Sequence, residues 1–290
     1  MNRSRSALRN LILSMLIFGT IGIVRRAIAL PSAAIAAARG LVGAAFLFAL
    51  QRLRKERLDR AAVRANLAPL LVSGALMGIN WIALFEAYRY TTVAVATLCY
   101  YMAPVLVIAL SPLALRERLT ARKCLCLLLA VAGMVPVSGV LDGGGAGSLS
   151  GVLLGLLAAS LYAAVVLINK RLKPIPAADR TILQLLAAGA VLLPYTLLVD
   201  GPGAFAAADG RSIALLAVVC IVHTGLAYAL YFGSVAFLPA HTLALLSYID
   251  PVVAVLLSAL LLREPITLRT AVGAVLILGA AVLGELPENK

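Results

Sequence analysis

The fold is decided by residues 98–122, LCYYMAPVLVIALSPLALRERLTAR, because this stretch recurs 147 positions later as LLSYIDPVVAVLLSALLLREPITLR at residues 245–269. Twelve of the 25 aligned positions are identical. Shared apolar composition explains matching leucines, but it does not explain a shared Tyr-x-x-Pro, a shared Arg-Glu pair and a shared Thr at one offset. The chain is therefore predicted to contain an internal duplication.

Both copies lie in a chain too apolar to fold in water. Of its 290 residues 63% are hydrophobic and 13% charged, and the mean hydropathy is +1.04. A soluble enzyme, a disulfide scaffold and a disordered chain are excluded. Ten apolar runs have about the length needed to cross a bilayer, which predicts an all-α integral membrane protein with ten transmembrane helices at residues 11–30, 33–51, 67–88, 92–115, 122–140, 149–168, 179–199, 211–236, 239–262 and 269–286.

The basic residues predict the orientation. The net charge of +13 would suggest nucleic acid in a soluble protein, but here the charges gather in a few loops and no nucleic-acid partner is expected. A cytoplasmic N-terminus places 18 Lys and Arg inside and 6 outside, as the positive-inside rule requires. Residues 3–9 imitate the start of a secretory signal, yet Arg25 and Arg26 precede its cleavage pattern, so the segment is expected to stay as the first helix. We expect a multi-pass protein of a bacterial cytoplasmic (inner) membrane, with both termini cytoplasmic.

The number of spans in each copy predicts how the halves are related. Residues 1–141 and residues 149–290 each hold five spans, and five is odd. The second copy must therefore enter the membrane from the opposite side. Inverted repeats are typical of secondary transporters, in which the substrate site lies between the halves and one half rocks against the other to give alternating access.

These patterns resemble the EamA-type transporters of the drug/metabolite transporter superfamily. The resemblance rests on Phe18-Gly19, Tyr162, Arg39, the two Tyr-x-x-Pro helices, and residues 116–120 with 263–267. It implies ten helices in two inverted five-helix repeats. Similar family members export or import amino acids and other small metabolites, and a few carry quaternary amines. The chain departs from the family pattern at Phe18, where Trp is common, and at Gln184, which stands where the first half has Arg39.

Arg39 is the first candidate for a functional site, because a charge inside a span needs a partner, a water-filled cavity or a role. Its guanidinium could bind a substrate carboxylate or phosphate through a planar fork of donors. The alternative is a structural ion pair or carbonyl contact between helices.

Asp250 is the second candidate, and it lies near the middle of the ninth span. Pro251 disfavours helical geometry at the preceding residue, so a kink is expected at Asp250. A carboxylate at a kink suits a proton or a substrate amine. The alternative is a pairing with Arg39 or His223 that only holds helices together. The mirror position in the first copy is Ala103, so any carboxylate role is confined to one half.

Other polar and aromatic residues are candidates for the cavity wall. Glu86 and Arg89 are three apart, which favours a local ion pair, although Glu86 could instead face a cavity with Asn80 and Trp81 and neutralise a cation. His223 is expected to be a neutral core residue or a proton relay. The predicted substrate-binding set is Arg39, Asn80, Trp81, Glu86, Tyr101, Tyr228, Tyr248 and Asp250, and the predicted coupling set is Asp250, Glu86 and His223.

Together these features predict a secondary active transporter, and its first expected activity is the export of amino acids or related small polar metabolites. The alternative cargo is a quaternary or aromatic cation moved with a coupling proton, and the alternative classes are a channel, a scaffold or a membrane enzyme. No HExxH or GxSxG motif is present, so no enzyme is expected. No cofactor or metal is implied. The expected partners are a small-molecule substrate, a coupling proton and the lipid bilayer, and the protein is expected to be a monomer or homodimer.

Overall fold

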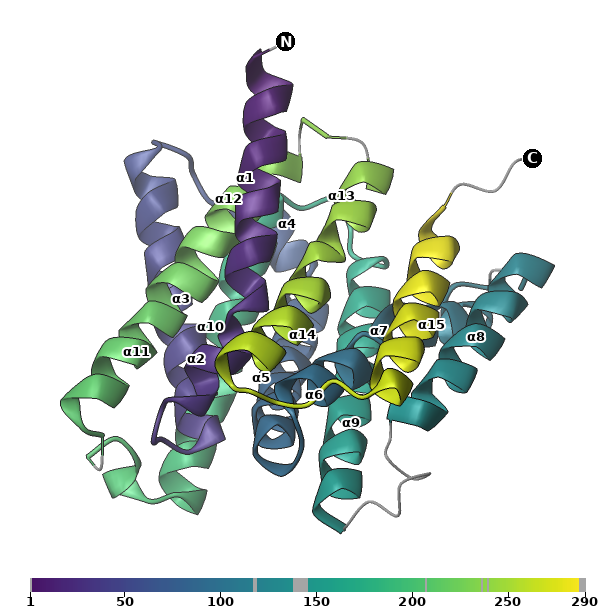
Figure 1. Cartoon of the computed structure of the whole chain (residues 1–290). Coiled ribbons are helices and arrows are strands. Elements are labelled where there is room, and N and C mark those ends of the chain that lie inside the picture. Colours follow the sequence, from purple (N-terminus) through teal and green to yellow (C-terminus); the bar gives the residue numbers. More distant parts are fainter. Residues whose placement is uncertain are drawn as a thin grey trace.

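The computed structural model describes residues 2–116, 119–137, 146–206, 208–235, 237–238 and 240–286, and within them it contains helices and no strands. The helices form one bundle (Figure 1). Their bounds are α1 Asn2–Gly19, α2 Ile21–Arg26, α3 Ser32–Leu53, α4 Arg60–Ala65, α5 Leu67–Tyr90, α6 Val93–Tyr100, α7 Ala103–Leu115, α8 Ala121–Val137, α9 Ala146–Asn169, α10 Ala177–Val199, η2 Pro202–Ala204, α11 Gly210–Cys220, η3 Ile221–Leu226, α12 Ala227–Val235, α13 Ala240–Ser247, α14 Ile249–Leu261 and α15 Leu268–Glu285.

Seven helical segments of the described chain are long and apolar enough to cross a membrane: 4–26, 32–53, 67–90, 93–115, 149–169, 177–199 and 210–234. Two further apolar helices, 249–261 and 268–284, are shorter. The predicted fifth span holds α8, whose first turn carries Arg122 and Lys123. The protein is thus an all-helical, multi-pass membrane protein. The N-terminal end of α1 and the C-terminal end of α15 lie on the same face, the upper one in Figure 1.

Both Tyr-x-x-Pro segments interrupt their helix. The first helix is interrupted at Tyr101 and Met102, between α6 and α7, and the second at Tyr248, between α13 and α14. The predicted kink at Asp250 is therefore wrong by two residues. Pro251 lies in the first turn of α14, where a missing N–H breaks no hydrogen bond, so the interruption falls before Asp250 and not at it.

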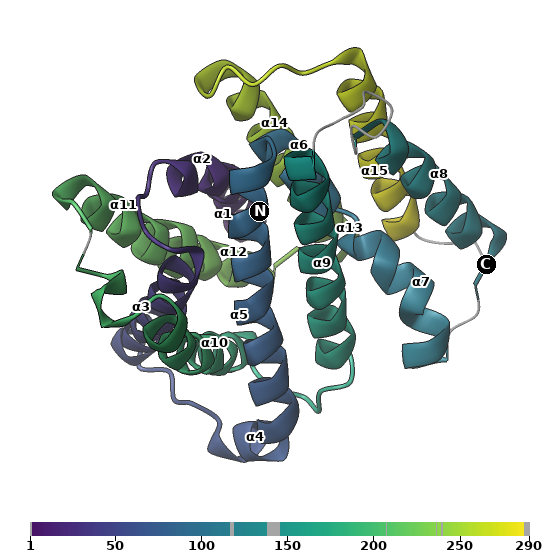
Figure 2. The same cartoon turned by 90° about the horizontal axis from the view of Figure 1, so that it is seen from below.

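The bundle is built from pairs of helices that are distant in sequence. The most extensively packed pairs are α3 with α10, α5 with α9, α8 with α15 and α5 with α10, followed by α1 with α12. The paired helices lie side by side when the molecule is seen from below (Figure 2). Glycines allow the α3–α10 crossing. A Cβ on Gly40 would lie 2.7 Å from the backbone nitrogen of Gly189, and one on Gly189 would lie 2.9 Å from the backbone nitrogen of Leu41.

We expect Gly40→Ala and Gly189→Ala each to lower the free energy of unfolding by about 1–3 kcal/mol, because the added methyl meets backbone that cannot rotate away. Gly279→Ala in α15 is the matched control, since a Cβ at that position would meet no atom of the described chain within 4 Å. That variant should be neutral or slightly stabilising. Melting curves in one detergent compare the three, and equal melting temperatures would contradict the close crossing.

Candidate functional site

A cavity of about 320 Å³ lies between the helices of the two sequence halves. Arg39 and Asp250 are the charged members of its described wall. The rest of the wall is largely aromatic. Its rings belong to Phe18, Trp81, Phe85, Tyr88, Tyr100, Tyr101, Tyr162, Tyr228, Tyr231 and Tyr248.

Arg39 projects from α3 and is only 5% exposed. Its Nε donates a hydrogen bond of 2.9 Å to the hydroxyl of Thr224, and its Cζ lies 4.1 Å from the centroid of the Trp81 ring. No carboxylate of the described residues forms an ion pair with it. The structural ion pair considered from the sequence is therefore not found. These contacts orient the guanidinium but leave its two terminal nitrogens without a hydrogen-bond acceptor from the described chain.

The partner of Arg39 is positioned by a π-helical turn, η3. The wider turn directs the Thr224 hydroxyl to the carbonyl of Val219, five residues earlier, at 3.0 Å. His223 in the same turn contacts the carbonyl of Val218 at 3.3 Å and the hydroxyl of Thr20 at 2.8 Å. Single π turns within α-helices occur frequently at functional sites. No sequence pattern indicated this turn, and Thr224 was not among the predicted site residues.

Asp250 lies in the first turn of α14, where the helix dipole favours a negative charge. The hydroxyl of Tyr101 donates a hydrogen bond of 2.7 Å to its Oδ2. This contact joins the interruption of one Tyr-x-x-Pro helix to the restart of the other. Neither Arg39 nor His223 forms an ion pair with Asp250, so the pairing considered from the sequence is not found. The Oδ1 oxygen has no hydrogen-bond donor among the described residues.

Six of the predicted site residues line the cavity together: Arg39, Trp81, Tyr101, Tyr228, Tyr248 and Asp250. Asn80 does not, because its side chain points to α9 and donates a hydrogen bond of 2.5 Å to the carbonyl of Ala158. Glu86 forms the local ion pair with Arg89 at 3.0 Å. His223 faces Thr20. Among the described residues, no three His, Cys, Asp or Glu side chains gather as they would around a metal ion.

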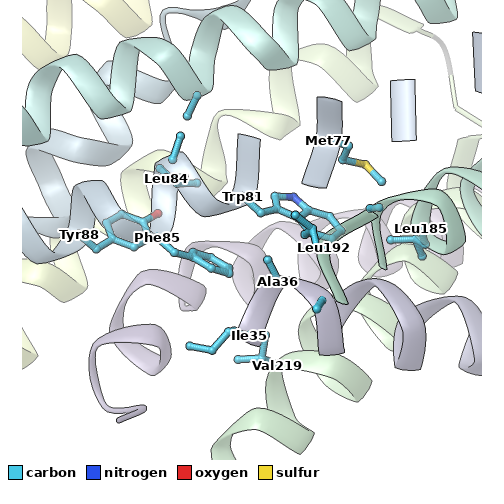
Figure 3. Packing of buried hydrophobic residues seen from close by; sticks show 14 of the residues in the cluster. Ile35, Ala36, Met77, Trp81, Leu84, Phe85, Tyr88, Leu185, Leu192 and Val219 are labelled. Atoms are coloured by element: carbon cyan, nitrogen blue, oxygen red, sulfur yellow. The ribbon is translucent and has the colours of Figure 1, made fainter. Parts of the chain in front are cut away.

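Phe85 and Tyr88 extend the aromatic wall along α5. Figure 3 shows Trp81, Phe85 and Tyr88 following one another along the helix, as residues three or four apart do. Phe85 is fully buried and Tyr88 nearly so. Phe85 matches Phe232 at the 147-residue offset, a signal that marked it in the sequence without indicating its place in the cavity wall.

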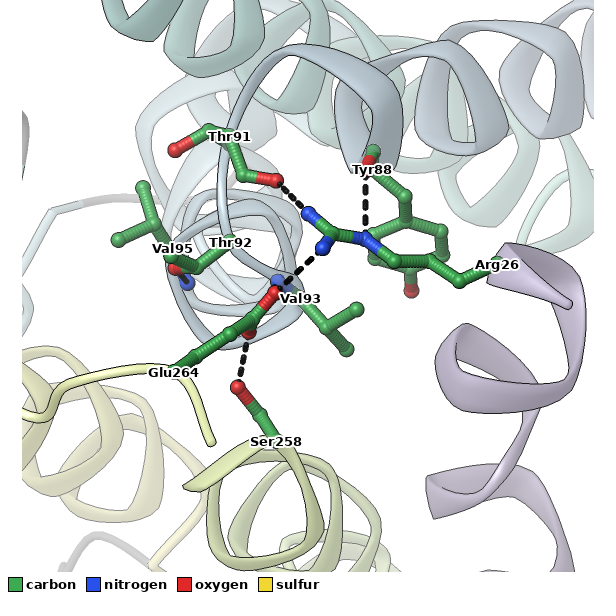
Figure 4. Close-up of polar contacts among 8 residues, drawn as sticks. All are labelled: Arg26, Tyr88, Thr91, Thr92, Val93, Val95, Ser258 and Glu264. Carbon is green, nitrogen blue, oxygen red and sulfur yellow. Dashed lines mark hydrogen bonds and ion pairs between the residues drawn. The ribbon is translucent and has the colours of Figure 1, made fainter. Parts of the chain in front are cut away.

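At the lower end of the bundle an ion pair joins three separate segments (Figure 4). Arg26 in α2 lies 2.8 Å from Glu264 in the loop between α14 and α15, and it donates hydrogen bonds to the carbonyls of Tyr88 and Thr91. Glu264 also accepts hydrogen bonds from the backbone of Val93, at 2.9 Å, and from Ser258. We call these contacts the Arg26–Glu264 latch. The matching Glu117 of the first copy is outside the described residues.

Apolar helices that enclose a buried charged cavity, with interrupted helices contributing to its wall, define the class of membrane transporters. The comparisons with known proteins give the family. The chain belongs to the EamA-like transporter family, whose pattern matches residues 6–139 and again residues 149–284.

Two relatives are themselves named as transporters. The chain is 29% identical over 287 residues to the uncharacterized transporter YxxF of Bacillus subtilis (strain 168), covering 96% of this chain and 89% of that protein. It is 27% identical over 202 residues to an uncharacterized transporter of Archaeoglobus fulgidus, covering 68% of each. A protein of known crystal structure shares the fold, with a TM-score of 0.67 and 20% identity over 96% of this chain and 97% of that chain.

Proposed function

We propose that this protein is a secondary active transporter that carries amino acids or related small zwitterionic metabolites, and that it exports them across the cytoplasmic membrane by alternating access. The observation that carries the proposal is the pair of opposite charges in one aromatic cavity. Arg39 offers its terminal guanidinium nitrogens to a carboxylate, and Asp250 offers its Oδ1 oxygen to an ammonium group or a coupling proton. Burial strengthens such charge-assisted hydrogen bonds.

The helix pairing supports the internal duplication, and the odd number of spans in each copy is the argument for the inversion on which alternating access rests. With the chain counted as ten spans, residues 1–141 and 149–290 supply five each. In this count α1 corresponds to α9 and α12 corresponds to α5, so the contact between α1 and α12 has its counterpart in the contact between α9 and α5. The helices α3 and α10 correspond to each other, as do α8 and α15, so these two pairs are their own counterparts. All four pairs are in contact. The helices that precede the two Arg-Glu pairs, α7 and α14, also end alike. Both Arg116 and Arg263, which follow these helices, adopt positive φ, at 58° and 54°.

A second cargo, a quaternary or aromatic cation, is favoured by the rings around Asp250. Aromatic faces bind such cations, and Tyr100, Tyr101 and Tyr248 form a connected group with centroids 6.0 and 6.1 Å apart. The guanidinium of Arg39 in the same cavity would repel a cation that lacks a carboxylate. A zwitterion is therefore the better match.

The experiment is solute exchange in liposomes that contain the purified protein. We expect saturable exchange of at least one amino acid, and at least tenfold slower exchange of both its methyl ester and its N-acetyl derivative, because each derivative removes one charged group and a hydrogen bond to a charged group contributes about 1.5–3 kcal/mol. Exchange of choline in preference to every zwitterion would favour the cationic cargo. Ion currents without exchange would identify a channel and contradict the proposal.

A further inference from the structure

A second cavity of about 690 Å³ opens at the lower end of the bundle, beside the latch. Its wall includes three arginines, Arg25, Arg26 and Arg89, and one acid, Asp200. We call it the arginine vestibule. Its remaining wall residues are Ile28, Ala29, Leu30, Pro31, Phe85 and Tyr88.

Arg25 is a buried cation that has no anionic partner in the described part of the chain. It is 4% exposed, and it donates hydrogen bonds to neutral acceptors, the carbonyl of Ile28 at 3.2 Å and the hydroxyl of Ser32 at 2.8 Å. Its Nε has no hydrogen-bond partner among the described residues. Burying a guanidinium without a counter-charge is costly, so an anion that enters the vestibule would be stabilised there.

The acids near the vestibule are already engaged elsewhere, apart from Asp200. Glu264 is held by Arg26 in the latch, and Glu86 by one terminal nitrogen of Arg89. The other guanidinium nitrogens of Arg89, whose side chain is 61% exposed, have no acceptor among the described residues. Donors for an incoming carboxylate therefore remain on both Arg25 and Arg89.

The vestibule and the central cavity share a wall, because Phe85 and Tyr88 line both. The centroid of the Phe85 ring lies 5.9 Å from the Cζ of Arg25 and 6.0 Å from the Cζ of Arg39. The Phe85 ring thus lies within about 6 Å of the buried arginine of each cavity. Trp81 and Phe85 are four residues apart on α5, a rise of about 6 Å, so the ring nearest Arg39 and the ring nearest Arg25 are one helical turn apart.

We propose that the arginine vestibule is a second binding site for the carboxylate of the transported solute, with Phe85 and Tyr88 as the movable partition between it and the central cavity. This inference rests on the proposed function, and it adds where the acidic group binds after it leaves Arg39. The chemistry that the site recognises is a single exposed carboxylate.

The test measures the charge preference of the vestibule in the full-length protein. Ala29 in the wall is replaced by cysteine in a chain whose four native cysteines are replaced by serine, and the protein is held in nanodiscs of neutral phosphatidylcholine. Reaction rates are measured with anionic sulfonatoethyl and cationic trimethylammonioethyl methanethiosulfonate. Ala206→Cys is the reference, because Ala206 is exposed on a neighbouring loop but is not part of the wall.

We expect the anionic-to-cationic rate ratio at position 29 to exceed that at position 206 by about tenfold, as a focused positive potential accelerates anions. Arg25→Gln and Arg89→Gln should each lower the ratio at position 29 only, whereas Arg25→Lys should retain it. Because Arg89 is exposed, Arg89→Gln is expected to fold, and it tests the proposal even if Arg25→Gln does not fold. Equal ratios at the two positions would overturn the proposal.

A matched pair of probes then tests carboxylate binding. Benzoate should slow labelling at position 29 and benzamide, the uncharged analogue, should not, and Arg89→Gln should weaken the protection. Equal protection by both probes would overturn the inference. So would protection that appears on adding anionic phosphatidylglycerol without benzoate, because the site would then hold a lipid headgroup. The labelling requires no transport, so the two experiments can fail independently. A negative labelling result would overturn the vestibule site but not the proposed transport, and a lack of exchange in liposomes would not affect the labelling result.

Discussion

Arg39→Gln is expected to weaken binding of a transported zwitterion by about 10- to 100-fold while the protein stays folded. The size follows from the loss of charge-assisted hydrogen bonds to a carboxylate, which contribute about 1.5–3 kcal/mol, and tenfold corresponds to about 1.4 kcal/mol. The measurement is the rise in melting temperature that each solute produces in detergent, since a ligand that binds only the folded state stabilises it.

Arg52→Gln is the matched control, because Arg52 lies on the same helix as Arg39 but is exposed. It should leave binding unchanged. Arg39→Lys should recover only part of the affinity, since lysine keeps the charge but lacks the planar fork that stacks on Trp81 and bonds Thr224. Full binding by folded Arg39→Gln would show that Arg39 acts only between helices.

The second large effect is expected at the Arg26–Glu264 latch. Glu264→Gln should lower the free energy of unfolding by about 2 kcal/mol, because removing one partner of a hydrogen-bonded charge pair leaves the other charge poorly compensated, and this pair is partly buried, with the Arg26 side chain 34% exposed. The Glu264 side chain is only 9% exposed and contacts three segments. A double-mutant cycle with Arg26→Gln, read from denaturant or thermal unfolding, measures the coupling.

The pair Glu86–Arg89 provides the internal comparison. It has similar geometry but higher exposure, 22% and 61% for the two side chains, and exposed pairs contribute about 0.2–1 kcal/mol. Its cycle with Glu86→Gln and Arg89→Gln should therefore give less than half the coupling of the latch. Equal coupling energies in the two cycles would mean that the ion pair between Arg26 and Glu264 contributes no more to stability than an exposed pair does.

Much of the architecture could be predicted from the sequence because the lengths of the apolar runs and the internal repeat can be read from it directly. The family assignment is confirmed. Each of the ten predicted spans overlaps a described helix, but seven segments of the described chain have full spanning length, so ten spans remain a prediction. The kink was predicted at Asp250 because a proline inside a helix disturbs the residue before it. In the structure a new helix, α14, begins two residues before Pro251. Pro251 therefore lies in a first turn, where it is tolerated.

The site was harder to predict because residues that are adjacent in the sequence of a helix point in different directions. Consecutive residues of an α-helix diverge by about 100°, so Asn80 points to α9 while Trp81 lines the cavity, and Glu86 leaves the cavity while Phe85 stays in it. The contact between Arg39 and Thr224 depends on a π turn, for which the sequence gives no periodic signal.

Asp250 has Ala103 as its counterpart in the first copy, so under the proposed function any proton coupling through the cavity wall is confined to one half of the molecule. In the proposed cycle, the one carboxylate of the described cavity wall, Asp250, would carry one proton. One elementary charge moved through 100 mV supplies about 2.3 kcal/mol, which sustains a concentration ratio of about 50-fold at about 1.4 kcal/mol per factor of ten. In the proposed cycle, a steeper gradient of the solute would need a second ionisable group, and residue 103 is the matching position in the first copy.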